Sequence, residues 1–206
     1  MADRTRTAKS PPSDSDEGLI RRHIGGDHGA FAHLLARYRH RIVTLVRYRL
    51  GRDSLWVEDV AQEVFLQIHH HARRFEGRSK FKTWLFAVAL NVCRDHVRRE
   101  RRHAGVHVSE EENERPLADL PSESLDPLAL MARSEREALV KCAIDRLTPT
   151  QRTILQLRDW EDLTYDEIAH VLSVPVGTVR SRLHNARAAL AQALVNHLKG
   201  RWDGLP

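Results

Sequence analysis

Residues 164–187 decide the fold of the second half of the chain, and they read TYDEIAHVLSVPVGTVRSRLHNAR. Thr164 stands three residues before Glu167, a spacing at which the two side chains satisfy exposed N–H groups in the first turn of a helix. Apolar residues at helical spacing follow, and the pattern breaks at residues 173–175. A further helix resumes from about Val179. Helix, short turn and helix is the pattern of a helix-turn-helix motif.

The helix after the turn has an apolar side and a polar side. At 100° per residue, one narrow stripe is formed by Val179, Leu183, Ala186 and Leu190. The opposite side carries Ser181, His184 and Asn185, and it is flanked by Arg180, Arg182 and Arg187. Such side chains suit base edges in a major groove and the phosphates beside it. A solvated helix face is the alternative, and the capping and turn spacing favour DNA recognition over it.

Working outward, the chain divides into four segments. A second capping box, Thr148 to Gln151, marks the preceding helix, and this helical block spans residues 134–198. Residues 104–133 are acidic and rich in Pro and Ser, which predicts a flexible linker. Residues 19–103 show helical periodicity, with one expected buried stripe formed by Phe31, Leu34, Leu35, Tyr38, Ile42, Leu45 and Val46. Residues 1–18 are expected to form a disordered tail. The predicted fold is therefore all-α, with two small helical domains.

Charge is spread unevenly along these segments. Residues 21–108 carry 18 Lys or Arg and 8 Asp or Glu, whereas residues 109–126 carry 1 and 7. The whole chain has a formal net charge of +5. A strongly basic block gains affinity for a polyanion by counterion release, so the first domain favours a nucleic-acid partner.

The predicted helix at residues 57–72 does not fit this basic pattern. Its apolar side consists of Val60, Ala61, Val64, Phe65 and Ile68, and its other side of Asp59, Gln62, Glu63 and Leu66. Acidic side chains around an exposed Leu suit a protein partner better than DNA. A solvated face with one stray Leu is the alternative.

A basic loop at residues 73–80 and the helix after it suggest binding of single-stranded DNA. Arginines there alternate with aromatic residues, so charge can follow a DNA backbone while flat rings receive unstacked bases. Trp84 and Leu85 are expected to be core residues, and Phe75 to be exposed. Asn91 is expected to present its amide toward the loop that contains Phe75.

Three runs in this chain resemble extracytoplasmic-function sigma factors of the sigma-70 family. They are VEDVAQEVF at residues 57–65, FEGRSKFKTWL at residues 75–85 and VGTVRSRL at residues 176–183. They look like parts of the second and fourth conserved regions of that family, in the right order. The resemblance spans about residues 19–103 and 134–196.

The resemblance implies a set of partners and contacts. The chain would bind core RNA polymerase through its beta and beta-prime subunits, and an anti-sigma factor would hold it inactive. The polymerase contacts would be Asp59, Gln62, Glu63 and Leu66. The single strand of the minus-ten promoter element would contact Phe75, Gly77, Arg78, Ser79, Asn91, Arg94 and Arg98. The duplex of the minus-thirty-five element would contact Thr178, Arg180, Ser181, Arg182, His184, Asn185 and Arg187.

Two other functions fit parts of the sequence. A stand-alone helix-turn-helix regulator would account for the last 60 or so residues, but it leaves the first domain unexplained. A metal site would need several of His69, His70, His71, His96, His103 and His107, yet consecutive helical histidines point 100° apart.

The sequence indicates neither an enzyme nor a cofactor. The two cysteines, Cys93 and Cys142, form no CxxC pair, so neither a disulfide framework nor a cysteine zinc site is expected. No signal peptide or membrane segment is evident, so we expect a cytoplasmic protein without membrane insertion.

Overall fold

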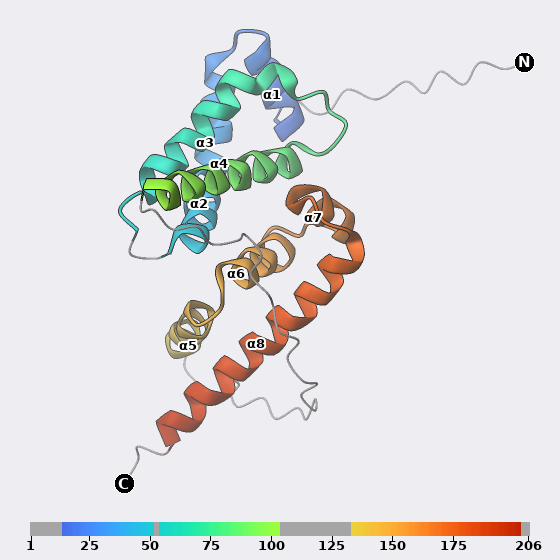
Figure 1. Cartoon of the computed structure of the whole chain (residues 1–206). Coiled ribbons are helices and arrows are strands. Elements are labelled where there is room, and N and C mark those ends of the chain that lie inside the picture. The colour runs from blue at the N-terminus through green and yellow to red at the C-terminus, as the bar shows by residue number, and fades with distance from the viewer. Residues whose placement is uncertain (1–13, 52–53, 104–132, 203–206) are drawn as a thin grey trace, which may run out of the picture.

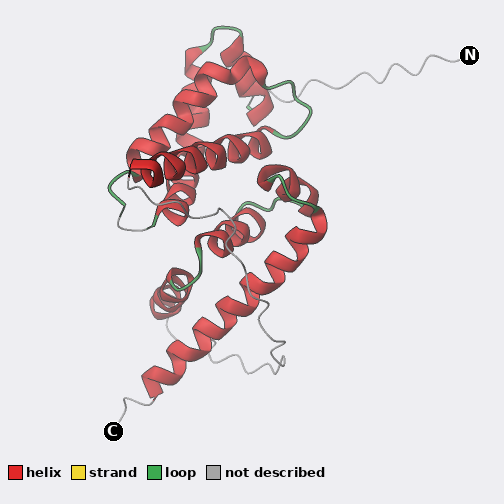
Figure 2. Cartoon of the chain, viewed as in Figure 1, coloured by secondary structure: helices red, strands yellow, loops and turns green. Residues whose placement is uncertain are grey.

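The computed structural model describes residues 14–51, 54–103 and 133–202, and its regular elements in those ranges are all helical (Figures 1 and 2). The predicted all-α fold is confirmed. Helices α1 (Asp16–Ile24), α2 (His28–Leu50), α3 (Val57–His71) and α4 (Phe81–His103) form the first domain, with a 3₁₀ turn at Ala72–Arg74. The predicted linker, residues 104–133, lies outside the described residues except for its last one.

The core of the first domain lies where α2, α3 and α4 pack against one another. Leu34, Ile42 and Leu45 of α2 meet Val64 and Ile68 of α3 and the phenyl rings of α4, all nearly inaccessible to solvent. Burying each such side chain contributes about 1.5–3 kcal/mol. The stripe predicted on α2 is therefore largely correct. Phe31 and Leu35 at its edge are only half-buried.

The N-terminal boundary of this domain differs from the prediction, because α1 begins at Asp16, inside the segment expected to be a disordered tail. Asp16 accepts hydrogen bonds from Arg37 and from the Tyr38 hydroxyl. The carboxylate of Glu17 accepts a hydrogen bond of 2.9 Å from the backbone N–H of Phe81, at the start of α4. The N-terminal helix therefore fixes the start of α4, which directly follows the basic loop.

The second domain consists of α5 (Arg133–Asp145), α6 (Pro149–Leu155), α7 (Tyr165–Leu172) and α8 (Val176–Trp202). Both predicted capping boxes are present, one at Thr148 and Gln151 and the other at Thr164 and Glu167. A π-helical turn, Gln156–Trp160, follows α6. Helix α8 runs to Trp202, beyond the predicted domain end at residue 198, and it packs along α5, α6 and α7.

The two domains lie against each other, with α4 packed on α7 and α2 packed on α6 (Figure 1). The contact is partly ionic, since Arg41 of α2 lies 3.3 Å from the carboxylate of Glu161 in the second domain. The Gln156 amide also donates a 3.1 Å hydrogen bond to the backbone carbonyl of Arg41. Within the three described ranges, no helix is long and apolar enough to span a membrane.

Candidate protein and nucleic-acid interfaces

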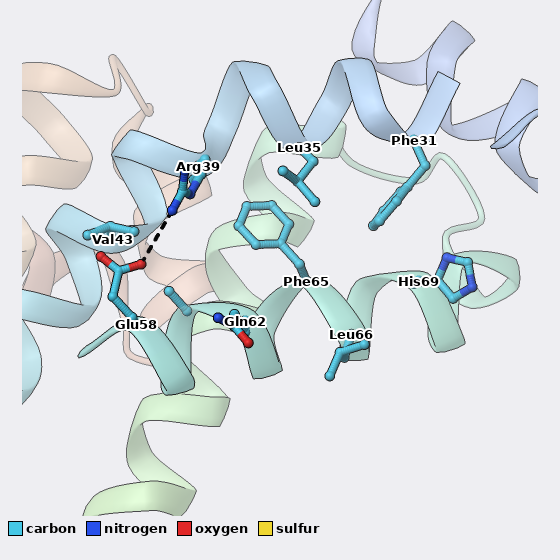
Figure 3. Close-up of a pocket in the computed structure, with 10 residues that line it drawn as sticks. Phe31, Leu35, Arg39, Val43, Glu58, Gln62, Phe65, Leu66 and His69 are labelled. Atoms are coloured by element: carbon cyan, nitrogen blue, oxygen red, sulfur yellow. Dashed lines mark ion pairs between the residues drawn. The ribbon is translucent and has the colours of Figure 1, made fainter. Parts of the chain in front are cut away.

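An apolar groove of about 410 Å³ lies between α2 and α3 (Figure 3). Leu35 and Val43 project from α2 and Phe65 from α3. At one end, Arg39 and Glu58 form an exposed ion pair of 3.7 Å. A concave apolar surface with a few charges at its rim fits apolar side chains from a protein partner.

The residues predicted to bind a protein partner do not all face the same side of α3. Gln62 and Leu66 line the groove, and Leu66 is 51% exposed. Asp59 is exposed in the first turn of α3. Glu63 is turned to the other side, where it accepts a 2.7 Å hydrogen bond from Gln67 and lines a different groove, beside α4. Gln62 and Leu66 therefore face the groove, and Glu63 does not.

The groove itself could not be predicted from the sequence. It depends on α2, whose residues Phe31, Leu35 and Val43 complete its apolar wall. The apolar periodicity of α2 includes Phe31 and Leu35. Periodicity alone does not show which part of that apolar stripe a neighbouring helix covers and which part stays exposed. The available signal would have been an apolar stripe on α2 that is too wide for one neighbouring helix to cover.

The basic loop after α3 is built around an aromatic cluster. Phe75, expected to be exposed, is only 9% exposed, so that prediction was wrong. Its ring centroid lies 5.7 Å from that of Phe81 and 5.5 Å from that of Trp84, distances typical of packed aromatic pairs. Leu85 is buried as predicted, whereas Trp84 is half-buried and lines the cavity at the loop.

The exposed part of the loop is polar. Gly77 has a φ of +71°, a backbone conformation that favours glycine, and it turns the chain between Glu76 and Arg78. Arg78 is exposed and pairs with Glu76 at 2.6 Å, and Ser79 is half-buried. Residues 76–79 therefore present one guanidinium, a hydroxyl and open backbone, next to the packed aromatic rings.

Asn91 does not lie at this loop, contrary to our expectation. It is seven residues beyond Trp84 on the same helix, which is about 10 Å along the axis. It lines a polar groove of about 490 Å³ between α3 and α4, together with Glu63 and Arg98. Arg94 donates a 3.2 Å hydrogen bond to the Asn91 side chain, and Arg98 pairs with Asp95 at 2.6 Å. The predicted single-strand residues thus form two clusters.

The helix-turn-helix has the predicted geometry. Thr164 and Glu167 cap α7 reciprocally, with hydrogen bonds of 3.2 and 2.8 Å. Ser173 ends α7 in the left-handed conformation, at a φ of +56°, and α8 begins at Val176. This turn fixes which side of α8 faces the core.

The two sides of α8 follow the predicted pattern at this end of the helix. Val179, Leu183 and Ala186 are buried, each at most 2% exposed. Arg180, Ser181, His184 and Arg187 are exposed, and Thr178, Arg182 and Asn185 are half-buried. The polar side chains expected to contact duplex DNA therefore share the solvent-facing side of one well-anchored helix.

Arg187 differs from the other basic residues of α8 because it is held within the domain. Its guanidinium lies 2.6 Å from the carboxylate of Asp159, in the π-helical turn. This hydrogen bond raises the pKa of Arg187. Binding a DNA phosphate would require Arg187 to share or leave Asp159, a contact that could not be predicted from residue spacing.

The histidines that suggested a metal site have other neighbours. The ring centroid of His69 lies 4.9 Å from that of buried His23 and 5.3 Å from that of Phe31. Burial lowers the pKa of His23, and the nearby His69 and His28 lower it further. Among the described residues, no group of three or more His, Cys, Asp or Glu side chains could hold a metal ion; His107 lies outside those residues.

Comparison with known proteins matches both domains. The model for sigma-70 region 2 matches residues 34–103, and the model for sigma-70 region 4 matches residues 137–190. The RNA polymerase sigma-H factor of Pseudomonas aeruginosa is 39% identical over 187 residues, which cover 88% of this chain and 94% of that protein. The ECF RNA polymerase sigma-E factor of Escherichia coli strain K12 is 36% identical over 180 residues, 85% of this chain and 92% of that protein.

The chain belongs to the extracytoplasmic-function group of the sigma-70 family. The match to region 2 accounts for the first domain, which a stand-alone helix-turn-helix regulator leaves unexplained. In this sigma factor, the α2–α3 groove and the loop at Phe75 both lie in region 2, and the exposed side of α8 lies in region 4.

Solved structures agree with this assignment. CnrH, in its complex with the cytosolic domain of CnrY, has a TM-score of 0.58 and 25% identity, covering 86% of this chain and 96% of CnrH. The sigma factor RpoE in complex with the anti-sigma factor NepR, from Bartonella quintana, has a TM-score of 0.57 and 21% identity, covering 80% and 96%. At 21% identity, the likeness to RpoE shows a shared fold and nothing more.

Proposed function

We propose that this sigma factor binds core RNA polymerase through its first domain, directs it to promoters through both domains, and promotes strand opening. The observation that supports this most strongly is the presence, in one chain, of an apolar groove, a basic loop region and a helix-turn-helix. Duplex recognition alone would need only the last of these. The role requires no catalytic group or cofactor of the chain's own, and it places the protein with polymerase in the cytoplasm.

We assign the polymerase contact to the exposed surface of α3, with Gln62 and Leu66 at its centre and Asp59 and Glu63 at its edges. The beta-prime subunit would supply the main partner surface and the beta subunit further contacts. An apolar side chain such as Leu66, surrounded by polar groups that exclude water, has the composition of a binding hot spot. Charged neighbours would then orient the partner and accelerate association.

The two promoter elements are assigned to different domains. The minus-ten single strand would bind Gly77, Arg78 and Ser79 at the loop, with Phe75 and Trp84 packed beneath it. Asn91, Arg94 and Arg98 would contact the same strand further along, in the groove between α3 and α4. On α8, Ser181, His184, Asn185 and Thr178 would contact base edges of the minus-thirty-five duplex, and Arg180, Arg182 and Arg187 its phosphates.

We also propose an anti-sigma partner. CnrH, the structural relative at 25% identity, was solved with the cytosolic domain of CnrY bound. The apolar α2–α3 groove of this chain gives such a partner a surface to occupy, and an inhibitor seated there would compete directly with polymerase. Competition of this kind needs no change in the DNA-binding residues.

Affinity purification from bacterial lysate tests the polymerase assignment. The tagged full chain should retain the polymerase subunits, identified by mass spectrometry, and the variant Asp59→Lys with Gln62→Ala should lose them while keeping its helical circular dichroism. Retention of polymerase by the double variant would contradict the assignment to α3. Recovery of no polymerase by the unaltered chain would contradict the proposed function itself.

A further inference from the structure

Helix α1 contacts both ends of the basic loop in the first domain. It packs against the 3₁₀ turn Ala72–Arg74, where the loop begins, and against α4, which starts where the loop ends (Figure 1). Leu19 and Ile20 of α1 are at most 1% exposed, so this helix is anchored in the domain core. One N-terminal helix therefore connects the two ends of the segment that we assign to the minus-ten strand.

The residue before α4 cannot cap this helix. Lys80 stands in that position, and its ammonium can only donate hydrogen bonds. The ammonium pairs with Glu167 of α7 at 3.0 Å. A Ser, Thr, Asp or Asn side chain there would accept a hydrogen bond from the first turn of the helix. An acceptor for the N–H groups at the start of α4 must therefore come from another part of the chain or from water.

Glu17 supplies such an acceptor from 64 positions earlier in the chain. Its half-buried carboxylate accepts a 2.9 Å hydrogen bond from the backbone N–H of Phe81, the first residue of α4. Hydrogen bonds to a charged acceptor are stronger than neutral ones, and a negative charge at a helix N-terminus interacts favourably with the helix dipole. Asp16 instead accepts hydrogen bonds from Arg37 and Tyr38 of α2. The two adjacent carboxylates thus tie α1 to two different helices.

Phe81 connects this anchor to the loop. Its side chain is 1% exposed, and its ring centroid lies 5.7 Å from that of Phe75 and 5.9 Å from that of Trp84. Residues 76–79 lie next to these rings in the chain and line one cavity with Phe75 and Trp84. A shift at the start of α4 would therefore move the aromatic cluster and the loop together.

We propose that Glu17 is a positioning residue for strand opening, which holds the start of α4, and with it the basic loop, in the geometry that receives the minus-ten strand. The inference rests on the proposed function, since it takes residues 75–79 as part of the single-strand site. Unstacking a base costs free energy, and a loop that is already ordered loses less entropy when it binds the strand. The contribution of Glu17 therefore falls on strand capture and not on the affinity for core polymerase, which we assign to α3.

Three variants of Glu17 separate its hydrogen bond from its charge. Glu17→Ala and Glu17→Leu remove the acceptor, and Leu keeps much of the side-chain volume. Glu17→Gln keeps an oxygen that can accept the bond from Phe81, but it loses the charge, which also lies favourably in the first turn of α1. A difference between the Ala and Gln variants therefore reports the hydrogen bond.

Asp27→Ala is the matched control. The Asp27 carboxylate caps another helix of the same domain, since it accepts a 3.1 Å hydrogen bond from the backbone N–H of Ala30 in α2. Its removal should lower the stability of the domain about as much as removal of the Glu17 carboxylate. Because Asp27 contacts neither the loop nor α4 in these bonds, its loss should leave strand capture unchanged.

Strand capture by the holoenzyme gives the functional readout. The probe is a labelled non-template strand of the minus-ten region, taken from a promoter selected from bound genomic DNA. Glu17→Ala and Glu17→Leu should weaken its binding about fivefold, the equivalent of one lost cap. Glu17→Gln should restore most of the affinity. Binding to core polymerase should be the same for all variants, and permanganate reactivity of the duplex promoter should follow the order of strand affinity.

Fluorine NMR of the free full chain gives a readout that does not depend on polymerase. Incorporation of 5-fluorotryptophan labels all four Trp residues, and Trp84→Phe assigns the signal of the one in the aromatic cluster. Glu17→Ala should shift or broaden the Trp84 signal. Glu17→Gln should keep it close to its original position, and Asp27→Ala should move it little.

A displaced Trp84 signal with weaker strand binding for Glu17→Ala, both restored by Glu17→Gln, would support the proposal. If Glu17→Ala proved unfolded by circular dichroism, Glu17→Leu would take its place in the comparison. An unchanged Trp84 signal, unchanged strand binding, or an equal loss for Asp27→Ala would overturn the proposal. If the unaltered chain bound no core polymerase, the proposed function would fall, and the fluorine spectra would still show whether Glu17 holds the loop.

Discussion

The two regions of this sigma factor that we propose to contact DNA are built differently. In the second domain, the exposed residues stand on one side of α8, and the buried stripe of Val179, Leu183 and Ala186 fixes that side. In the first domain, the loop at residues 75–80 is held by an aromatic cluster, and its neighbours include residues from another domain. A helix face follows from local periodicity, whereas a loop surface depends on contacts distant in sequence.

Phe75 gives the largest expected effect and tests whether the loop depends on its aromatic cluster. Because the ring is packed against Phe81 and Trp84, Phe75→Ala should destabilise the first domain by about 3–5 kcal/mol, measured by urea unfolding. Phe75→Leu should cost much less, since it keeps most of the apolar volume. A Phe75→Ala variant of normal stability would show that the ring is free to stack on DNA bases.

The groove on α3 gives the next largest effect. Leu66→Asp should weaken binding to core polymerase by about 2–4 kcal/mol, because the side chain is a hot-spot candidate and is too exposed for the change to unfold the domain. Arg21→Gln, at an exposed position of α1 that is assigned to no interface, is the control and should change affinity little. Equal losses for both variants, measured by fluorescence anisotropy, would mean that the groove does not define the partner surface.

The exposed side of α8 should separate into base and phosphate contacts. Ser181→Ala and His184→Ala should each alter the preferred upstream sequence, by about 1–3 kcal/mol per lost base contact. Arg182→Ala should weaken binding to all promoters similarly. Footprinting of the holoenzyme on a set of promoter variants checks this, and the same pattern of loss for all three variants would contradict the division.

The capping boxes give the smallest effect. Thr164→Ala and Thr148→Ala should each lower the free energy of unfolding of the second domain by about 1 kcal/mol, because each leaves an N-terminal N–H group without its partner. Thr164→Ser should retain the hydroxyl and most of the stability. A loss at Thr164 far above that at Thr148 would indicate that this cap also supports the contact of Glu167 with Lys80.

The predictable features of the fold are those marked by local chemistry. Both capping boxes, the break at Ser173 and the faces of α8 follow from residues within a few positions of one another. Position 16 illustrates the limit, since Asp16 looks like part of a polar tail but contacts Arg37 and Tyr38 of α2.

The candidate site shows the same limit more clearly. Phe75 stands in a basic, Gly-containing loop, and its burial depends on Phe81 and Trp84 of the next helix. Arg187 has the helical position of a DNA contact, yet Asp159, 28 residues earlier, holds it. The groove needs two helices whose packing angle the sequence does not specify. Residue type and period identify candidates, and tertiary packing decides which remain accessible.

Promoter opening reconstituted from purified components tests the central claim most directly. Core polymerase, this protein and a duplex promoter selected from bound genomic DNA should together make thymines of the minus-ten region reactive to permanganate. Neither protein alone should do so, and Arg78→Ala with Asn91→Ala should reduce the reactivity while polymerase binding stays intact. A duplex that remains fully paired with both proteins bound, or that the chain alone recognises as a dimer, would contradict the account.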